Sequence, residues 1–289
     1  MTPSSTGPER LSGVTAIILA AGVGSRMGAA EPKVLHPLLG RPMALWVLQS
    51  IHTAVSDPAI LLLSPATAAL HALALKGTLR AEQPEPRGTG DAVRCALPAL
   101  PAGATEILIA CGDTPLLEPS TISALITARR AAKVPLALAV FHADDPTGYG
   151  RVELNDAGRA TRIVEERDAS PETRESDLVN AGLYVVERAW LETALKGLTA
   201  SKATGEIYLT DLVAAAAAAG SPAPILLGSG ADLEGVNDRR QFADAAAALR
   251  ERINAGHMER GVGMVDPTTI WIDPTVEIAA DVTIEPNVM

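Results

Sequence analysis

Residues 16–37 hold the side chains best suited to phosphate chemistry in this sequence. An apolar run leads into a glycine-rich turn, and two cations lie within and just after that turn. Backbone N–H groups at such a turn, together with positive charge, can bind a polyphosphate. The spacing G-x-G-x-x-x-G differs from the dinucleotide-binding G-x-G-x-x-G, and no G-x-x-x-x-G-K-[ST] loop occurs. The residues are Gly22, Gly24, Gly28, Arg26 and Lys33, and taken alone they also fit an ordinary strand-to-helix turn with two solvated cations.

Asp113 is the carboxylate best placed to bind a metal ion. It follows the apolar segment 106–110, in the sequence Cys111-Gly-Asp-Thr-Pro-Leu116. Mg²⁺ prefers hard oxygen ligands and is often shared with substrate phosphates, so a carboxylate at the end of a strand is a candidate ligand. The alternative is a turn aspartate that accepts hydrogen bonds from nearby backbone N–H groups.

Short apolar segments alternate with segments of helical periodicity along most of the chain. This alternation predicts an α/β fold with a mostly parallel sheet and right-handed crossovers. Ligands of such sheets bind beyond the carboxyl ends of the strands, where both turns described above would lie, so we expect one shared site. Expected strands cover 14–21, 59–64, 106–110 and 134–141, hairpin-like segments cover 150–167 and 179–187, and expected helices cover 42–54, 66–76, 91–99, 211–220 and 240–258.

Composition narrows the functional classes. The chain has 289 residues, of which 47% are hydrophobic and 20% charged, as expected for a globular protein with a substantial core. The net charge of −10 argues against non-specific binding to nucleic acid or to an anionic membrane. The two cysteines, Cys95 and Cys111, lack metal-ligand spacing, and no signal-peptide or membrane-spanning pattern is present. We therefore expect free thiols and a cytoplasmic location.

The tail changes period. Ile270, Val276, Val282 and Val288 recur every six residues, which is typical of a parallel β-helix. Only about one coil fits before Met289, and a β-hairpin that pairs with the main sheet is the alternative. We therefore expect four parts: a polar tail over 1–13, the main domain over 14–240, a linker helix over 241–260 and the start of a hexapeptide-repeat helix over 261–289.

The segment 17–37 resembles the LxxGxGxRMxxxxPKxL signature of sugar-nucleotide pyrophosphorylases. Further motifs are similar to those of the uridyltransferase half of the bifunctional bacterial N-acetylglucosamine-1-phosphate uridyltransferase/glucosamine-1-phosphate acetyltransferase family, in the same order over about 14–240. The resemblance implies a Rossmann-like nucleotidyltransferase domain with a mostly parallel mixed sheet, then a linker helix and the first coil of a left-handed parallel β-helix. It also implies Mg²⁺-dependent transfer of UMP from UTP to N-acetylglucosamine 1-phosphate, a step in cell-envelope precursor synthesis. In this reaction the sugar phosphate is itself the nucleophile, so catalysis needs positioning and charge neutralisation.

The resemblance assigns roles to particular residues. Arg26 and Lys33 would neutralise phosphate charge, Arg26 by a bidentate grip and Lys33 as a movable point charge. Asp113 and Asn237, the latter in the E-G-V-N segment, would bind Mg²⁺. The remaining assignments are Leu19, Ala20, Ala21 and Gly22 at the nucleotide, Gln83, Gly88 and Thr89 at uracil, and Gly150, Glu165, Asn180 and Asn237 at the sugar. The segment Gly205-Glu-Ile-Tyr-Leu-Thr-Asp211 resembles the family motif that closes over the sugar.

Some positions depart from the family pattern. Cys111 stands where an aromatic residue is usual, and Pro84, Pro86 and Arg87 change the uracil loop. The alternatives are another sugar-1-phosphate nucleotidyltransferase, for example one using glucose 1-phosphate with UTP or dTTP, and a non-catalytic sugar-nucleotide sensor or scaffold. The acetyltransferase site of the family lies along a long β-helix, so we expect no acetyl transfer by this chain. The family forms trimers through that helix, so a homotrimer is expected only where the helix is complete.

Overall fold

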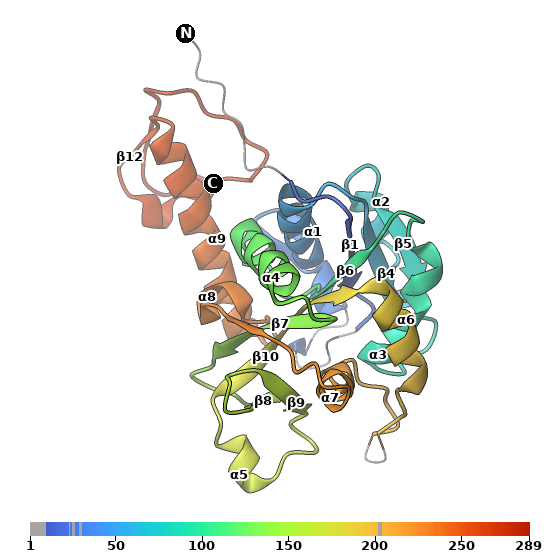
Figure 1. Ribbon diagram of the computed structural model, residues 1–289. Helices are drawn as coiled ribbons and strands as arrows, with labels where there is room; N and C mark the ends of the chain where they lie inside the picture. The colour runs from blue at the N-terminus through green and yellow to red at the C-terminus, as the bar shows by residue number, and fades with distance from the viewer. Residues whose placement is uncertain (1–9, 23, 25–26, 29–30, 202–203) are drawn as a thin grey trace.

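A mixed β-sheet forms the centre of the molecule in the computed structural model, which describes residues 10–22, 24, 27–28, 31–201 and 204–289 (Figure 1). Its strands are β1 (Val14–Leu19), β4 (Ala59–Leu63), β5 (Leu79–Glu82), β6 (Glu106–Cys111), β7 (Leu136–His142), β8 (Arg151–Leu154), β9 (Ala160–Val164), β10 (Leu178–Glu187) and β11 (Ile225–Leu227). The main path has the order β11-β7-β10-β6-β1-β4-β5. Strands β6, β1, β4 and β5 are parallel to one another, as expected from the alternating sequence.

Helices cover both faces of this sheet, because the central strands are apolar on both sides. Ile18 and Leu61 belong to the core beneath α1 and α4, whereas Ile17 and Ile60 belong to the core beneath α3, α6 and α7. Figure 1 shows these two groups of helices on opposite sides of β1 and β6. Their bounds are α1 (Met43–Ala54), α3 (Thr89–Ala96), α4 (Pro119–Ala132), α6 (Arg188–Gly197) and α7 (Asp211–Ala218).

One long antiparallel strand makes the sheet mixed. β10 lies between β6 and β7 and is antiparallel to both, and it also pairs with β8. β8 and β9 form the hairpin expected over 150–167. This hairpin extends the sheet beyond the carboxyl ends of the parallel strands, so its residues can form one side of a site at that edge.

The prediction of a helix over 66–76 is mostly wrong. The structure has a short 3-10 turn, η3 (Pro65–Thr67), and a four-residue helix, α2 (Leu70–Leu73). Leu70 is buried, but Leu73 and Leu75 are 59% and 42% exposed. An alanine-rich segment that buries so little apolar surface gains too little from packing to form a longer helix.

The C-terminal part follows a 21-residue helix, α9 (Arg239–Glu259), which carries the tail away from the sheet (Figure 1). The tail strands β12 (Gly263–Met264) and β13 (Thr283–Ile284) pair in parallel with each other. They form a separate two-stranded sheet, so the β-hairpin alternative is wrong. The Asn254 side chain donates to the carbonyls of Pro267 and Ile270 at 2.8 and 2.9 Å and holds the tail on α9. Among the described residues, no helix is both long and apolar enough to cross a membrane.

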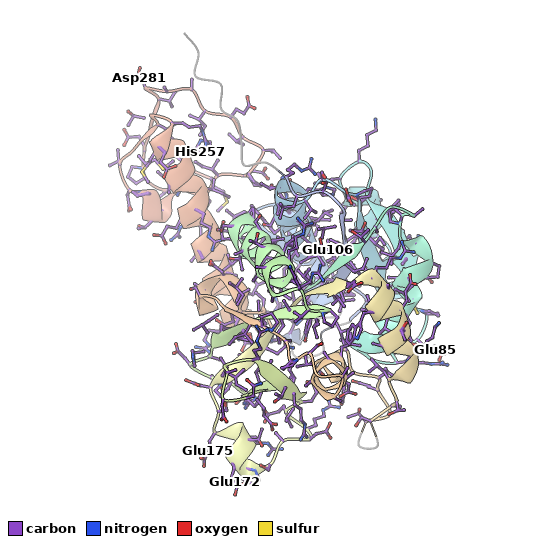
Figure 2. All side chains as sticks on the ribbon, in the orientation of Figure 1. Glu85, Glu106, Glu172, Glu175, His257 and Asp281 are labelled. Carbon is purple, nitrogen blue, oxygen red and sulfur yellow. The ribbon has the colours of Figure 1, made fainter. Side chains whose placement is uncertain are left out.

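Two arginines of α4 hold the first residue of β6. Glu106 is buried and accepts hydrogen bonds from Arg129 at 2.8 Å and Arg130 at 2.6 Å. Figure 2 shows it inside the molecule, whereas Glu172 and Glu175 lie at the periphery. Because β6 leads into the turn that carries Asp113, this ion-pair network anchors a strand of the candidate site.

We expect Glu106→Gln to lower the free energy of unfolding by about 2 kcal/mol, because two arginines would lose a buried anionic partner. Urea denaturation measures this value. Glu82→Gln is the control, because its ion pair with Arg80 is 42–44% exposed and should contribute less than about 1 kcal/mol. Equal losses in the two variants would contradict the anchoring role of Glu106.

Candidate active site

The glycine turn lies at the carboxyl end of β1. The Ala20 N–H donates to the Leu62 carbonyl at 2.9 Å, and the Gly112 N–H donates to the Leu19 carbonyl at 3.0 Å, so this turn is tied to both neighbouring strand ends. Gly24 has φ +64°, and a Cβ there would come within 2.7–2.9 Å of three side-chain carbons of Lys33. Glycine is therefore required where Lys33 crosses the turn. Arg26 lies outside the described residues.

Lys33, Asp113 and Asn237 meet although they are far apart in the sequence. The Lys33 ammonium lies 2.5 Å from Asp113 Oδ2 and donates to Asn237 Oδ1 at 2.9 Å. The Val236 N–H also donates to the Asp113 carbonyl at 2.8 Å. These side chains are partly buried, with Lys33 12% and Asp113 22% exposed, so their charges are less screened than those of a surface pair.

The two side-chain oxygens that face Lys33 are suited to bind a hard cation. A carboxylate oxygen and an amide oxygen already converge on one positive charge, and both are the ligand type that Mg²⁺ prefers. Among the described residues, no group of three or more histidine, cysteine or acidic side chains is suited to hold a metal. Mg²⁺ commonly uses one or two protein ligands and completes its shell with water and substrate phosphates, so two oxygens suffice.

A cavity of about 340 Å³ lies beside this cluster at the carboxyl ends of β1, β4 and β6. Its lining combines residues expected at the nucleotide with the cationic and acidic pair. The sequence-predicted residues that line it are Leu19, Ala21, Gly22, Lys33, Gln83, Gly88, Thr89 and Asp113, and Cys111 and Glu206 line it as well. The structure thus brings most of the expected nucleotide-site residues around one space.

The loop expected to bind uracil is held by its own side chains. Gln83 is buried, and its amide donates to the Gly88 carbonyl at 3.1 Å and to Asp91 at 2.9 Å. Gly88 has φ +99°, and a Cβ there would lie 2.5 Å from the Ile207 carbonyl oxygen. Glycine is needed here because the segment 204–210 packs directly on the loop.

The residues expected at the sugar form a second group at the open end of the β8–β9 hairpin, where Gly150 precedes β8 and Glu165 follows β9. The Asn180 N–H donates to the Gly150 carbonyl at 2.9 Å, and a Cβ on Gly150 would lie 2.7 Å from Ile163. The Thr210 hydroxyl donates to Glu165 at 2.7 Å. Burial raises the pKa of the Glu165 carboxyl, and this hydrogen bond opposes the rise.

Segment 204–210 connects the two groups. Its Ile207 N–H donates to the Arg87 carbonyl at 2.8 Å, and its Leu209 N–H donates to the Thr89 hydroxyl at 2.9 Å. Thr210, at the end of the segment, reaches Glu165. Glu206 and Thr210 belong to the motif 205–211, but the sequence alone indicates no role for either residue.

Cys111 lies at the end of β6 beside Gly182. A Cβ on Gly182 would come within 2.6 Å of the Cys111 sulfur, so glycine at 182 leaves the space that the Cys111 side chain fills. Burial and, secondarily, the charge of Asp113 raise the pKa of this thiol to about 12. It is therefore protonated near neutral pH and unsuited to act as a thiolate nucleophile.

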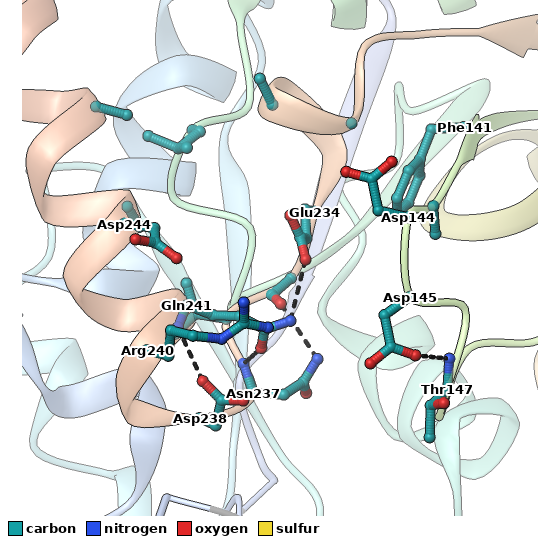
Figure 3. A pocket seen from close by; sticks show the side chains of 18 of the residues that line it. Phe141, Asp144, Asp145, Thr147, Glu234, Asn237, Asp238, Arg240, Gln241 and Asp244 are labelled. Atoms are coloured by element: carbon teal, nitrogen blue, oxygen red, sulfur yellow. Dashed lines mark hydrogen bonds between the residues drawn. The ribbon is translucent and has the colours of Figure 1, made fainter.

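A larger cavity, of about 720 Å³, opens on the other side of Asn237 (Figure 3). It lies between the segment 141–147, the short helix α8 (Gly230–Leu233) and the first turns of α9. Asn237 lines this cavity and contacts Lys33, so its loop separates the two spaces. Gln241, which no sequence motif indicated, lines the same cavity next to Asn237.

A glycine turn and a lysine–carboxylate pair at the carboxyl ends of the parallel strands are consistent with a nucleotidyltransferase, and the family match shows that class. The chain belongs to the family described as the MobA-like NTP transferase domain, whose model matches residues 16–182. It is 42% identical to the bifunctional protein GlmU of Pelobacter propionicus over 283 residues, 96% of this chain and 61% of that protein. It is also 42% identical to the protein of the same name from Sorangium cellulosum (94% of this chain, 59% of that protein) and 43% identical to that of Kineococcus radiotolerans (94% and 56%). The chain therefore spans about 60% of the length of these curated relatives.

Proposed function

We propose that this chain transfers UMP from UTP to N-acetylglucosamine 1-phosphate and releases pyrophosphate. The observation that carries the proposal is the cluster of Lys33, Asp113 and Asn237 beside the 340 Å³ cavity at the carboxyl edge of the sheet. Membership in the NTP transferase family and the similarity to proteins named GlmU support it.

The chemistry is an in-line displacement. A phosphate oxygen of the sugar 1-phosphate attacks the α-phosphorus of UTP, a new P–O bond forms, and the bond to the β-phosphate oxygen breaks with pyrophosphate as the leaving group. Lys33 would place positive charge beside these phosphates, and backbone N–H groups of the glycine turn would orient them. Arg26 is proposed to contribute a second cation from the same turn.

Asp113 and Asn237 are the residues proposed to hold Mg²⁺. When bound, the ion would neutralise part of the charge that develops on the transferring and leaving phosphates. Leu19, Ala20, Ala21 and Gly22 are proposed to contact the nucleotide, and Gln83, Gly88 and Thr89 the uracil. Gly150, Glu165 and Asn180 are proposed to bind the sugar.

The experiment is a panel of pyrophosphate-release assays with Mg²⁺, pairing UTP, dTTP and other triphosphates with N-acetylglucosamine 1-phosphate and glucose 1-phosphate. We expect UTP with N-acetylglucosamine 1-phosphate to give the highest kcat/KM. A different best pair would favour the alternative sugar-1-phosphate nucleotidyltransferase. Binding of the sugar nucleotide without turnover of any pair would favour the sensor.

Thr210→Val should weaken sugar-phosphate binding about tenfold, because an ionised Glu165 would lose a charge-assisted hydrogen bond. Burial raises the pKa of Glu165 and the Thr210 hydrogen bond lowers it, so removal of the hydroxyl raises this pKa further. The carboxylate then protonates at a higher pH, and the acid limb of kcat/KM for the sugar phosphate moves upward. Steady-state kinetics across pH measure the shift.

Thr210→Ser is the control, because it keeps the hydroxyl and should keep the wild-type pH profile. The raised pKa of Glu165 also affects stability. The contribution of this carboxyl to the free energy of unfolding is full below the pKa of an unfolded glutamate, and it is lost as pH rises through the raised pKa of the folded state. An unchanged acid limb in Thr210→Val would exclude an ionised Glu165 from sugar binding.

Further expectations from the sequence stay proposals. The tail is proposed to be the first coil of a left-handed parallel β-helix, with a homotrimer where that helix is complete. The main domain is proposed to cover 14–240, the linker helix 241–260 and the tail 261–289. The enzyme is proposed to act in the cytoplasm, where it would make a cell-envelope precursor.

A further inference from the structure

The first turn of α9 holds the loop that carries Asn237. Gln241 Oε1 accepts a hydrogen bond from the Asn237 main-chain N–H at 2.7 Å. Its Nε2 donates to Glu234 at 3.0 Å, so this one side chain spans the loop from 234 to 237 (Figure 3). Both ends of the loop that crosses the site are thereby fixed to the rigid helix.

The Asn237 loop also contacts Lys33 and Asp113 on its other side. The Asn237 side-chain oxygen accepts from Lys33, and the neighbouring Val236 N–H donates to the Asp113 carbonyl. The distance between the two candidate metal ligands therefore depends on how the backbone at 237 is held. The Gln241 side chain contacts this backbone from the α9 side of the loop.

We propose that Gln241 is a positioning residue that holds the Asn237 oxygen next to Asp113 and thereby sets the affinity of the site for a divalent cation. This inference rests on the proposed function, because it takes Asp113 and Asn237 as the metal ligands. Side chains that orient metal ligands from behind typically change metal affinity 10–100-fold when they are replaced.

This role is separable from helix capping. Asp238 caps α9 by accepting a hydrogen bond at 2.8 Å from the main-chain N–H of Gln241, and any residue at 241 other than proline retains that N–H. Gln241→Met has a similar length and high helix propensity but lacks both side-chain hydrogen bonds. It therefore removes the contact to Asn237 while the cap and the helix remain.

The chain also offers a matched rescue. Gln241→Glu alone keeps an acceptor for the Asn237 N–H but places a second carboxylate next to Glu234. Combined with Glu234→Gln, the acceptor and donor of that pair are exchanged, and both hydrogen bonds can form again. Recovery by this exchange would show that the two hydrogen bonds, and not the bulk of the side chain at 241, carry the effect.

The test is Mn²⁺ binding to the full chain by electron paramagnetic resonance, with the Mg²⁺ dependence of pyrophosphate release as a second measurement. We expect Gln241→Met to weaken Mn²⁺ binding and raise the activating Mg²⁺ concentration about tenfold, while kcat at saturating Mg²⁺ changes much less. The paired exchange should recover most of the loss. Asp244→Asn, one turn further along α9 on the same cavity, is the control and should stay near wild type.

The outcomes separate the two proposals. If wild-type protein neither binds Mn²⁺ nor needs Mg²⁺ for pyrophosphate release, the metal site in the proposed function is wrong. If wild-type protein needs the metal and Gln241→Met has the same metal dependence, the positioning role is wrong. A loss in Gln241→Met that falls entirely on kcat would also contradict it.

Discussion

Asp113→Asn is expected to reduce the turnover of UTP and N-acetylglucosamine 1-phosphate about 10³-fold, because the substitution removes the only charged ligand of the proposed metal pair. The amide keeps the shape of the side chain, and the Val236 N–H still has its main-chain acceptor at 113. The fold should therefore survive. Pyrophosphate release measures turnover, and thermal unfolding shows whether stability is retained.

Asp144→Asn is the matched control for this variant. Asp144 lies beyond the end of β7 and lines the larger cavity on the other side of the Asn237 loop. It carries the same charge as Asp113 but belongs to a different space, so its turnover should stay within about twofold of wild type. A wild-type rate for Asp113→Asn would overturn the assignment of Asp113 to the metal.

The parallel part of the fold could be predicted because local sequence signals and tertiary packing agree there. The strands expected at 14–21, 59–64 and 106–110 correspond to β1, β4 and β6, and the helix expected at 42–54 corresponds to α1. Apart from Thr15 and Glu106, these strands are apolar, and they are buried on both faces, which is the pattern of a parallel sheet.

Other elements depended on packing that a local pattern does not show. Helix α4 was not expected, although Pro119 at its first position and buried Ile122 and Leu125 are available signals. The helix expected at 66–76 failed for the opposite reason, since good intrinsic propensity there is not matched by burial. Helix propensity and apolar periodicity therefore predict a helix correctly where the folded chain also buries the apolar face of that helix.

The candidate site divides in the same way. Lys33 and Asp113 could be proposed from the sequence because Lys33 follows the glycine turn and Asp113 lies in the turn after an apolar strand. Thr210 and Gln241 could not, because a single threonine or glutamine acquires its role only from the group it meets, Glu165 or Asn237. Asp238 and Gln241 have the spacing of a helix cap, which is a signal for the start of a helix and carries no information about a site.

The period of the tail marked apolar residues without showing how far they are covered. Ile270 and Ile272 are buried, with Trp271 between them under the Arg250 guanidinium. Val276, Val282 and Val288 are 42–46% exposed. A six-residue repeat reports which side chains share a face, whereas their burial depends on neighbouring coils.

Lys33→Met should change metal binding and turnover in opposite directions. The Lys33 ammonium contacts both oxygens proposed to bind the metal, at 2.5 and 2.9 Å, so a divalent cation must compete with it for Asp113 and Asn237. Without the ammonium, Mn²⁺ should bind several-fold more tightly to the nucleotide-free protein. Turnover should fall about 10²-fold, because the phosphates lose a nearby positive charge.

Methionine is the suitable replacement because its unbranched stem can still pack over Gly24, where the Lys33 carbons lie. Lys33→Arg is the companion variant, because it keeps the charge and should retain the competition with Mn²⁺. Paramagnetic resonance and pyrophosphate release measure the two effects separately. If metal affinity and turnover of Lys33→Met fall together, the Lys33 ammonium does not compete with the metal for Asp113 and Asn237, and its contacts instead hold these two side chains in place.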